Sequence, residues 1–169
     1  MAARAFNQTS RLGASLDMIT DRVSTTGLMF ILSNLYPQYQ VCFILAVTLD
    51  IYSHWTQVYS TYATGSLSHK SSAGDSSIIL RFYYSKKPLF LFCFSAEAFI
   101  LAVYWIHFEP WLMDIPAFFA FTYAVGALFF GKQLIHIVQL WAAMNQVADL
   151  DVLEKKQAAA KLEKKAWVK

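Results

Sequence analysis

The sequence predicts an all-α, polytopic membrane protein, and three observations favour this fold class. Hydrophobic residues make up 57% of the 169 residues, aromatic residues 17% and charged residues only 15%, a balance too apolar for a water-soluble domain of this length. Four apolar stretches recur along the chain, and each can cross a hydrocarbon core as a helix of about 20 residues. A helix also satisfies its backbone polar groups internally, which lipid requires of an open chain.

The first apolar stretch begins as a polar helix near Ala14 and ends at Pro37. The fourth loses its apolar character after Phe130. Residues 60–87, between the second and third stretches, are rich in Ser, Thr and Gly and are expected to form a loop. We expect a membrane domain over residues 1–148 and a charged, solvated helical tail over residues 149–169. The four apolar stretches cover residues 23–36, 39–59, 88–108 and 115–143.

The basic residues lie on one side of the predicted membrane. The turn at Pro37 and the loop of residues 109–114 carry no Lys or Arg, whereas the loop of residues 60–87 carries several. The side that is rich in basic residues is typically cytosolic, so we expect an integral membrane protein with both termini in the cytosol. Because topology explains these charges, we expect membrane lipid and no nucleic acid as a partner. The basic residues of the loop are Lys70, Arg81, Lys86 and Lys87.

Gly13, Asp17 and Asp21 recur at every fourth position, which places them on one face of a helix. Two adjacent carboxylates repel each other unless a cation lies between them, and Mg²⁺ prefers oxygen ligands of this kind. Gly13 leaves room for a ligand one turn away. The alternative is a helix N-terminus, where acidic residues interact favourably with the helix dipole and Arg22 can pair with either aspartate.

The same residues belong to a longer motif. Ala3-Arg4 is followed by eight residues, Gly13, three residues, Asp17, three residues and Asp21. This spacing matches the second half of D-x2-D-G-x2-A-R-x8-G-x3-D-x3-D, so the chain resembles the CDP-alcohol phosphatidyltransferase family. The segments AARAFNQTSRLGASLDMITDR, LDIYSHW, SHK and LRFYY are similar to the eukaryotic branch that forms phosphatidylinositol.

The resemblance implies a fold of six transmembrane helices, of which four are expected here. It implies a transferase of phospholipid biosynthesis that moves a phosphatidyl group from CDP-diacylglycerol to myo-inositol and releases CMP. Mg²⁺ or Mn²⁺ would be the cofactor, with Asp17 and Asp21 as metal ligands and Asp21 also as the catalytic base. Ala3, Arg4 and Gly13 would bind the nucleotide. An endoplasmic reticulum location and a homodimer follow from the same resemblance.

The first half of the motif, D-x2-D-G, does not precede Ala3 in the sequence. We therefore expect an N-terminally truncated chain that has little activity alone. A non-catalytic isoform or paralogue that packs against the full-length enzyme is one alternative. A relative that uses another alcohol, such as glycerol phosphate, is a second, although LDIYSHW and SHK lie outside the shared motif and disfavour it.

Other ionisable residues occur at membrane depth, where they are costly and favour a functional hypothesis. Asp50 and His54 are one helical turn apart and form either a polar pocket wall or a structural polar pair. Lys70 and Arg81 bind substrate phosphates or serve as ordinary loop charges. The role of Glu97 stays open.

Two further features favour structural interpretations. Lys132 and His136, also one turn apart, are expected to extend toward the cytosolic interface without a chemical role. Cys42 and Cys93 are isolated thiols in apolar stretches and are expected to act as small apolar residues.

Overall fold

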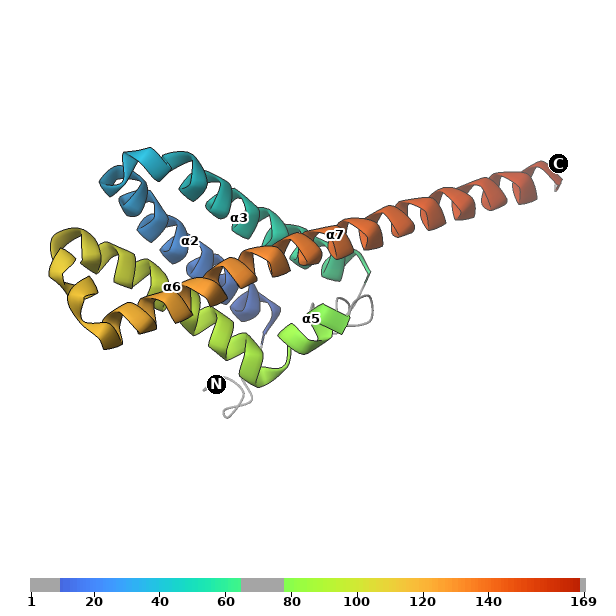
Figure 1. The fold of residues 1–169 in the computed structure, drawn as a ribbon. Helices are drawn as coiled ribbons and strands as arrows, with labels where there is room; N and C mark the ends of the chain where they lie inside the picture. Colours follow the sequence, from blue (N-terminus) through green and yellow to red (C-terminus); the bar gives the residue numbers. More distant parts are fainter. Residues whose placement is uncertain (1–9, 65–77, 168–169) are drawn as a thin grey trace. The chain divides into compact units, whose positions relative to one another are not determined.

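The computed structural model describes residues 10–64 and 78–167, and every regular element in this part of the chain is helical (Figure 1). This confirms the predicted all-α class. One sequence expectation needs correction, because the short helix α5 lies inside the segment expected to be a loop. The elements in chain order are α2 (Arg11–Leu35), η1 (Pro37–Tyr39), α3 (Gln40–Ala63), α5 (Ile78–Tyr83), α6 (Lys86–Phe108), η2 (Pro110–Asp114) and α7 (Pro116–Trp167).

Three described segments are long and apolar enough to cross a membrane, namely Pro37–Ala63, Lys86–Phe108 and Pro116–Glu163. The chain is therefore an integral membrane protein. The 25-residue helix α2 does not meet this criterion, because its first half is polar. The predicted crossing of residues 23–36 stays a prediction.

The helix ends follow local chemistry. At the start of α2, the Ser10 hydroxyl accepts a hydrogen bond from the Gly13 amide at 2.9 Å, which satisfies one of the free N–H groups of the first turn. Pro37, Pro110 and Pro116 each begin a helical element, as expected for a residue that has a fixed φ and no N–H to donate.

The described chain forms two compact units, and helices α3, α6 and α7 each contribute to both. The first unit contains residues 10–51 and 91–133. Its apolar core is extended by Tyr36, whose hydroxyl donates to the Val103 carbonyl oxygen at 3.0 Å and whose ring lies 5.2 Å from that of His107. These contacts bring the end of α2 and the end of α6 together, so the turns η1 and η2, which carry no Lys or Arg, lie at the same end of this unit. The buried core residues are Met29, Leu32, Ala96, Ile100 and Phe129.

The second unit contains residues 52–64, 78–90 and 134–167. Leu80 of α5 and Ala142 of α7 form its small apolar cluster. Neutral polar side chains also pack here between α3 and α7: the Ser60 hydroxyl donates to Gln146 Oε1 at 2.6 Å.

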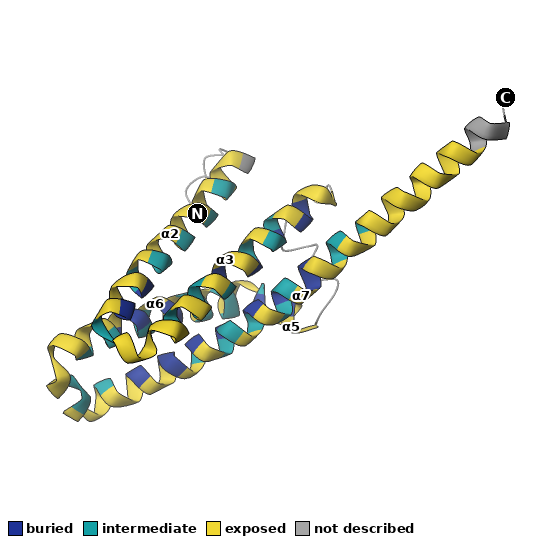
Figure 2. Ribbon diagram, turned by 90° about the horizontal axis from the view of Figure 1, so that it is seen from above, coloured by how far each residue is buried: buried dark blue, intermediate teal, exposed yellow. Residues whose placement is uncertain are grey.

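Beyond this unit's core, α7 continues as one helix whose side chains are exposed from residue 151 to residue 163 (Figure 2). The predicted domain boundary at residue 148 falls inside α7.

Candidate functional site

The polar first half of α2 carries the motif residues of the described chain. Gly13, Asp17 and Asp21 lie on successive turns of α2, and all three are exposed. A Cβ atom at Gly13 would lie 3.0 Å from the Ser10 hydroxyl oxygen. Glycine therefore leaves the capped first turn undisturbed and keeps this face of the helix open. Ala3 and Arg4 lie outside the described residues, so Gly13 alone represents the residues predicted to bind the nucleotide.

Asp17 and Asp21 act on each other electrostatically. Asp21 precedes the apolar half of α2, and its pKa is raised chiefly because neighbouring groups remove part of the hydration of its carboxylate. The charge of Arg22 opposes this shift, and the negative charge of Asp17 adds to it. A divalent cation would relieve the repulsion between two exposed carboxylates, so the donor set fits Mg²⁺ or Mn²⁺.

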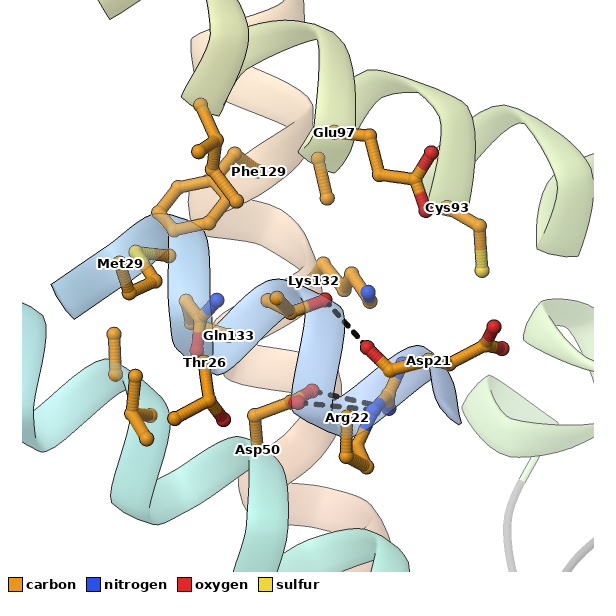
Figure 3. Close-up of a pocket in the computed structure, with 15 residues that line it drawn as sticks. Asp21, Arg22, Thr26, Met29, Asp50, Cys93, Glu97, Phe129, Lys132 and Gln133 are labelled. Atoms are coloured by element: carbon orange, nitrogen blue, oxygen red, sulfur yellow. Dashed lines mark hydrogen bonds and ion pairs between the residues drawn. The ribbon is translucent and has the colours of Figure 1, made fainter. Parts of the chain in front are cut away.

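A pocket opens beside Asp21 within the first unit (Figure 3). It encloses about 40 Å³, which is room for a few water molecules. Its walls come from α2, α3, α6 and α7, and apolar side chains close its inner end. The polar and ionisable side chains that line it are Asp21, Arg22, Thr25, Thr26, Asp50, Cys93, Glu97, Lys132 and Gln133.

One wall of the pocket is an ion pair between α2 and α3. Arg22 contacts Asp50 at two points: its Nε lies 3.1 Å from one carboxylate oxygen and its Nη1 donates to the other at 3.2 Å. Both side chains are largely buried, with exposed fractions of 15% and 8%. Such two-point geometry fixes orientation as well as distance. Arg22 thus extends across to α3, and Asp50 lines the pocket in an ion pair with Arg22.

Lys132 and Glu97 lie opposite this ion pair. Lys132 is buried, with an exposed fraction of only 6%, and it lines the pocket. The expectation that its side chain extends toward the interface is therefore wrong. Its position on α7, one turn after the core residue Phe129, directs it into the bundle. Glu97 on α6 is exposed at the pocket. Figure 3 shows the ends of Asp21, Glu97 and Lys132 facing the same space.

The remaining predicted residues lie elsewhere. His54 and His136 belong to the second unit, where their rings lie 5.1 Å apart in an edge-to-face arrangement. His136 is fully buried, so it does not extend toward an interface either. Arg81 is exposed on α5, and Lys70 lies outside the described residues. Asp50 and His54 have side-chain ligand atoms within 4.8 Å of each other, and the wider pocket wall with Lys70 and Arg81 stays a prediction.

Sequence reasoning did not assign Thr25, Gln133 or Cys93 to the pocket. Helical spacing could have found two of them, because Thr25 follows Asp21 by one turn and Cys93 precedes Glu97 by one turn. Cys42, the other thiol, is exposed on α3.

The membrane-spanning helices and their carboxylate-bearing pocket define an integral membrane protein with a polar site among its helices. The chain belongs to the CDP-alcohol phosphatidyltransferase family, whose model matches residues 1–148. This confirms the resemblance inferred from the motif.

Three relatives illustrate the match, and each is named CDP-diacylglycerol–inositol 3-phosphatidyltransferase. The fission yeast Schizosaccharomyces pombe protein is 36% identical over 96% of this chain and 76% of its own length. The Drosophila melanogaster protein is 35% identical over 96% of this chain and 72% of its own length. The Saccharomyces cerevisiae protein is 40% identical over 88% of this chain and 67% of its own length. No solved structure matches the chain.

Proposed function

We propose that this protein transfers the phosphatidyl group of CDP-diacylglycerol to myo-inositol, forming phosphatidylinositol and CMP. The observation that carries the proposal is the pair of exposed carboxylates, Asp17 and Asp21, on one face of α2 beside a polar pocket. The family membership and the shared name of the relatives supply the reaction and its substrates.

Asp21 is the catalytic base in this proposal. An inositol hydroxyl oxygen bonds to the phosphatidyl phosphorus, the bond from that phosphorus to the bridging oxygen of the diphosphate breaks, and CMP departs with the bonding electrons. The hydroxyl proton passes to Asp21. A carboxylate positioned within reach of a reacting hydroxyl can take its proton as a general base.

A divalent metal is the general cofactor of the family, and we propose Mg²⁺ or Mn²⁺ here. Asp17 and Asp21 would hold it with their carboxylate oxygens. When bound, the metal would neutralise charge on the diphosphate.

The remaining assignments come from motif position and charge. Ala3, Arg4 and Gly13 would bind the nucleotide. Lys70 and Arg81 would contact substrate phosphates, since an exposed guanidinium such as that of Arg81 binds phosphate at two points.

We further propose that the protein resides in the endoplasmic reticulum as a homodimer, with both termini in the cytosol. A thiol reagent that cannot cross membranes tests the topology in sealed microsomes of a protein without native cysteines. A cysteine introduced by Glu163→Cys should react from the cytosolic side, whereas one introduced by Asp114→Cys should react after the membrane is opened. Reaction of both from the cytosol would contradict this topology.

The activity test uses an active fusion, defined as this chain preceded by the N-terminal residues of the fission yeast relative, so that both halves of the motif are present. With Mn²⁺ and CDP-diacylglycerol, we expect CMP release to depend on inositol and phosphatidylinositol to accumulate. CMP release that depends on glycerol phosphate instead would identify glycerol phosphate, and not inositol, as the acceptor. No release with either alcohol would favour a non-catalytic role.

A further inference from the structure

Lys132 is a buried charge without a contact partner in the pocket. Its side chain is 94% buried, the complement of its 6% exposed fraction. Within residues 10–64 and 78–167, its ammonium forms no hydrogen bond and no ion pair at contact distance, and the ion pair on the pocket wall belongs to Arg22 and Asp50. A buried ammonium needs acceptors to compensate for its lost hydration. The charge of Asp21 compensates part of this cost, and a ligand that accepts hydrogen bonds would compensate more of it.

Gln133, the next residue of α7, provides a hydrogen-bond acceptor beside the Lys132 donor. Its amide oxygen is buried and has no hydrogen-bond donor among the described residues, and the side chain lines the same pocket. Buried amide oxygens are normally paired, so a ligand that can donate a hydrogen bond is favoured here.

Hydrogen-bonding chemistry selects among ligands. A fully ionised anionic group presents acceptors alone, so it pairs with the Lys132 ammonium but leaves the buried Gln133 amide oxygen without a donor. A hydroxyl group both donates and accepts, so a neutral polyol satisfies Lys132, Gln133 and the carboxylates together.

We propose that Lys132 and Gln133 form the polyol-acceptor subsite, with Glu97 at its rim; this rests on the proposed function. The acceptor approaches from the exposed side of Asp21 and Glu97, and its hydroxyls accept from the Lys132 ammonium and donate to the Gln133 amide oxygen. Because the enclosed space is about 40 Å³, the ring stays at the mouth and single hydroxyl groups enter. Asp21 then lies beside the bound polyol, where a proton acceptor is required.

The kinetic test compares Lys132→Met and Gln133→Leu in the active fusion, with the exposed Lys156→Met and Gln157→Leu variants as matched controls. We expect KM for inositol to rise ~10-fold or more for Lys132→Met and ~2–10-fold for Gln133→Leu, since a charged hydrogen bond contributes more than a neutral one. KM for CDP-diacylglycerol should stay near the parent value, and both controls should match the parent. A rise in KM for CDP-diacylglycerol alone would assign Lys132 to the diphosphate and overturn the subsite.

Thiol labelling gives a second test that leaves the subsite residues unaltered. Cys93 is half-buried and lines the pocket, so in a Cys42→Ser background inositol should slow its reaction with a membrane-permeant maleimide. In the reciprocal Cys93→Ser background, reaction at exposed Cys42 should not respond to inositol. Unchanged labelling of Cys93 at saturating inositol would overturn the subsite. An inactive parent fusion would contradict the proposed function, whereas an active parent with unaltered variants would contradict this inference alone.

Discussion

The two units of the chain bury polar side chains in different ways. In the first unit they include charged groups that line a pocket: Arg22 pairs with Asp50, and Lys132 faces the same space as the exposed Glu97. In the second unit, hydroxyl and amide side chains pair between helices, as the Ser60 hydroxyl does with Gln146, and the imidazoles of His54 and His136 pack together. The Gln139 amide likewise donates to the backbone oxygen of Ser53 at 3.4 Å.

This difference in buried polar groups distinguishes a functional site in the first unit from structural contacts between helices in the second. Charged groups at membrane depth are costly and persist where they act on a ligand or on each other. Neutral hydrogen bonds between helices contribute little individually and hold the helices in register. Substitutions in the first unit should therefore change chemistry or cause large losses of stability, whereas those in the second should have small effects.

The largest expected effect comes from Asp21→Asn in the active fusion. The amide keeps the size of the side chain and one acceptor oxygen but cannot take a proton. Loss of a positioned base lowers the rate ~10²–10⁴-fold, while affinity for CDP-diacylglycerol should largely remain. CMP release and nucleotide binding measure the two effects.

Asp17→Asn is the matched comparison, because Asp17 is proposed as a metal ligand alone. Turnover and nucleotide affinity should fall together and recover partly at high Mn²⁺. If both aspartates merely favour the helix N-terminus, each substitution should cost only about 0.3–1 kcal/mol of stability and leave catalysis near normal. Normal turnover by Asp21→Asn would end its assignment as the base.

Asp50→Leu tests the ion pair on the pocket wall. The change leaves the Arg22 guanidinium buried without its carboxylate, and breaking a buried pair in this way typically costs ~3–5 kcal/mol. SDS-induced unfolding followed by circular dichroism measures the loss. The double variant Arg22→Met/Asp50→Leu should recover much of it, since no unpaired charge remains. A double variant as unstable as Asp50→Leu would show that the pair contributes through packing alone.

Gly126→Ala tests apolar packing in the same unit. A Cβ atom at Gly126 would lie 2.9 Å from the Phe99 ring, and that ring is itself packed 5.0 Å from the ring of Phe129. The overpacking should cost ~1–3 kcal/mol in the same unfolding measurement. Gly27→Ala is the control, because nothing lies within 4 Å of its new methyl group, and it should stabilise α2 by ~0.5–1 kcal/mol. Equal behaviour of both variants would contradict this account of close packing.

Composition and motif spacing predicted the helical membrane fold and the family, because both are properties of the chain read along its length. The expected face of Gly13, Asp17 and Asp21 follows from helical spacing in the same way. The pocket could not be predicted, since it depends on which faces of α2, α6 and α7 meet. Lys132 illustrates this limit: its position near the end of an apolar stretch indicates an interfacial lysine, whereas packing directs it into the bundle.

The smallest expected effect comes from the neutral contacts of the second unit. Ser60→Ala removes the hydroxyl that donates to Gln146 Oε1, and both residues lie within this unit. Hydrogen bonds between membrane helices average ~0.6 kcal/mol, so the unfolding free energy should fall by about that amount. KM for inositol and for CDP-diacylglycerol should not change. Gln146→Leu and the double variant complete a thermodynamic cycle, whose coupling energy isolates the pair from its surroundings. A coupling as large as that between Arg22 and Asp50, or a change in either KM, would erase the distinction between the two units and give the neutral contacts a role in the reaction.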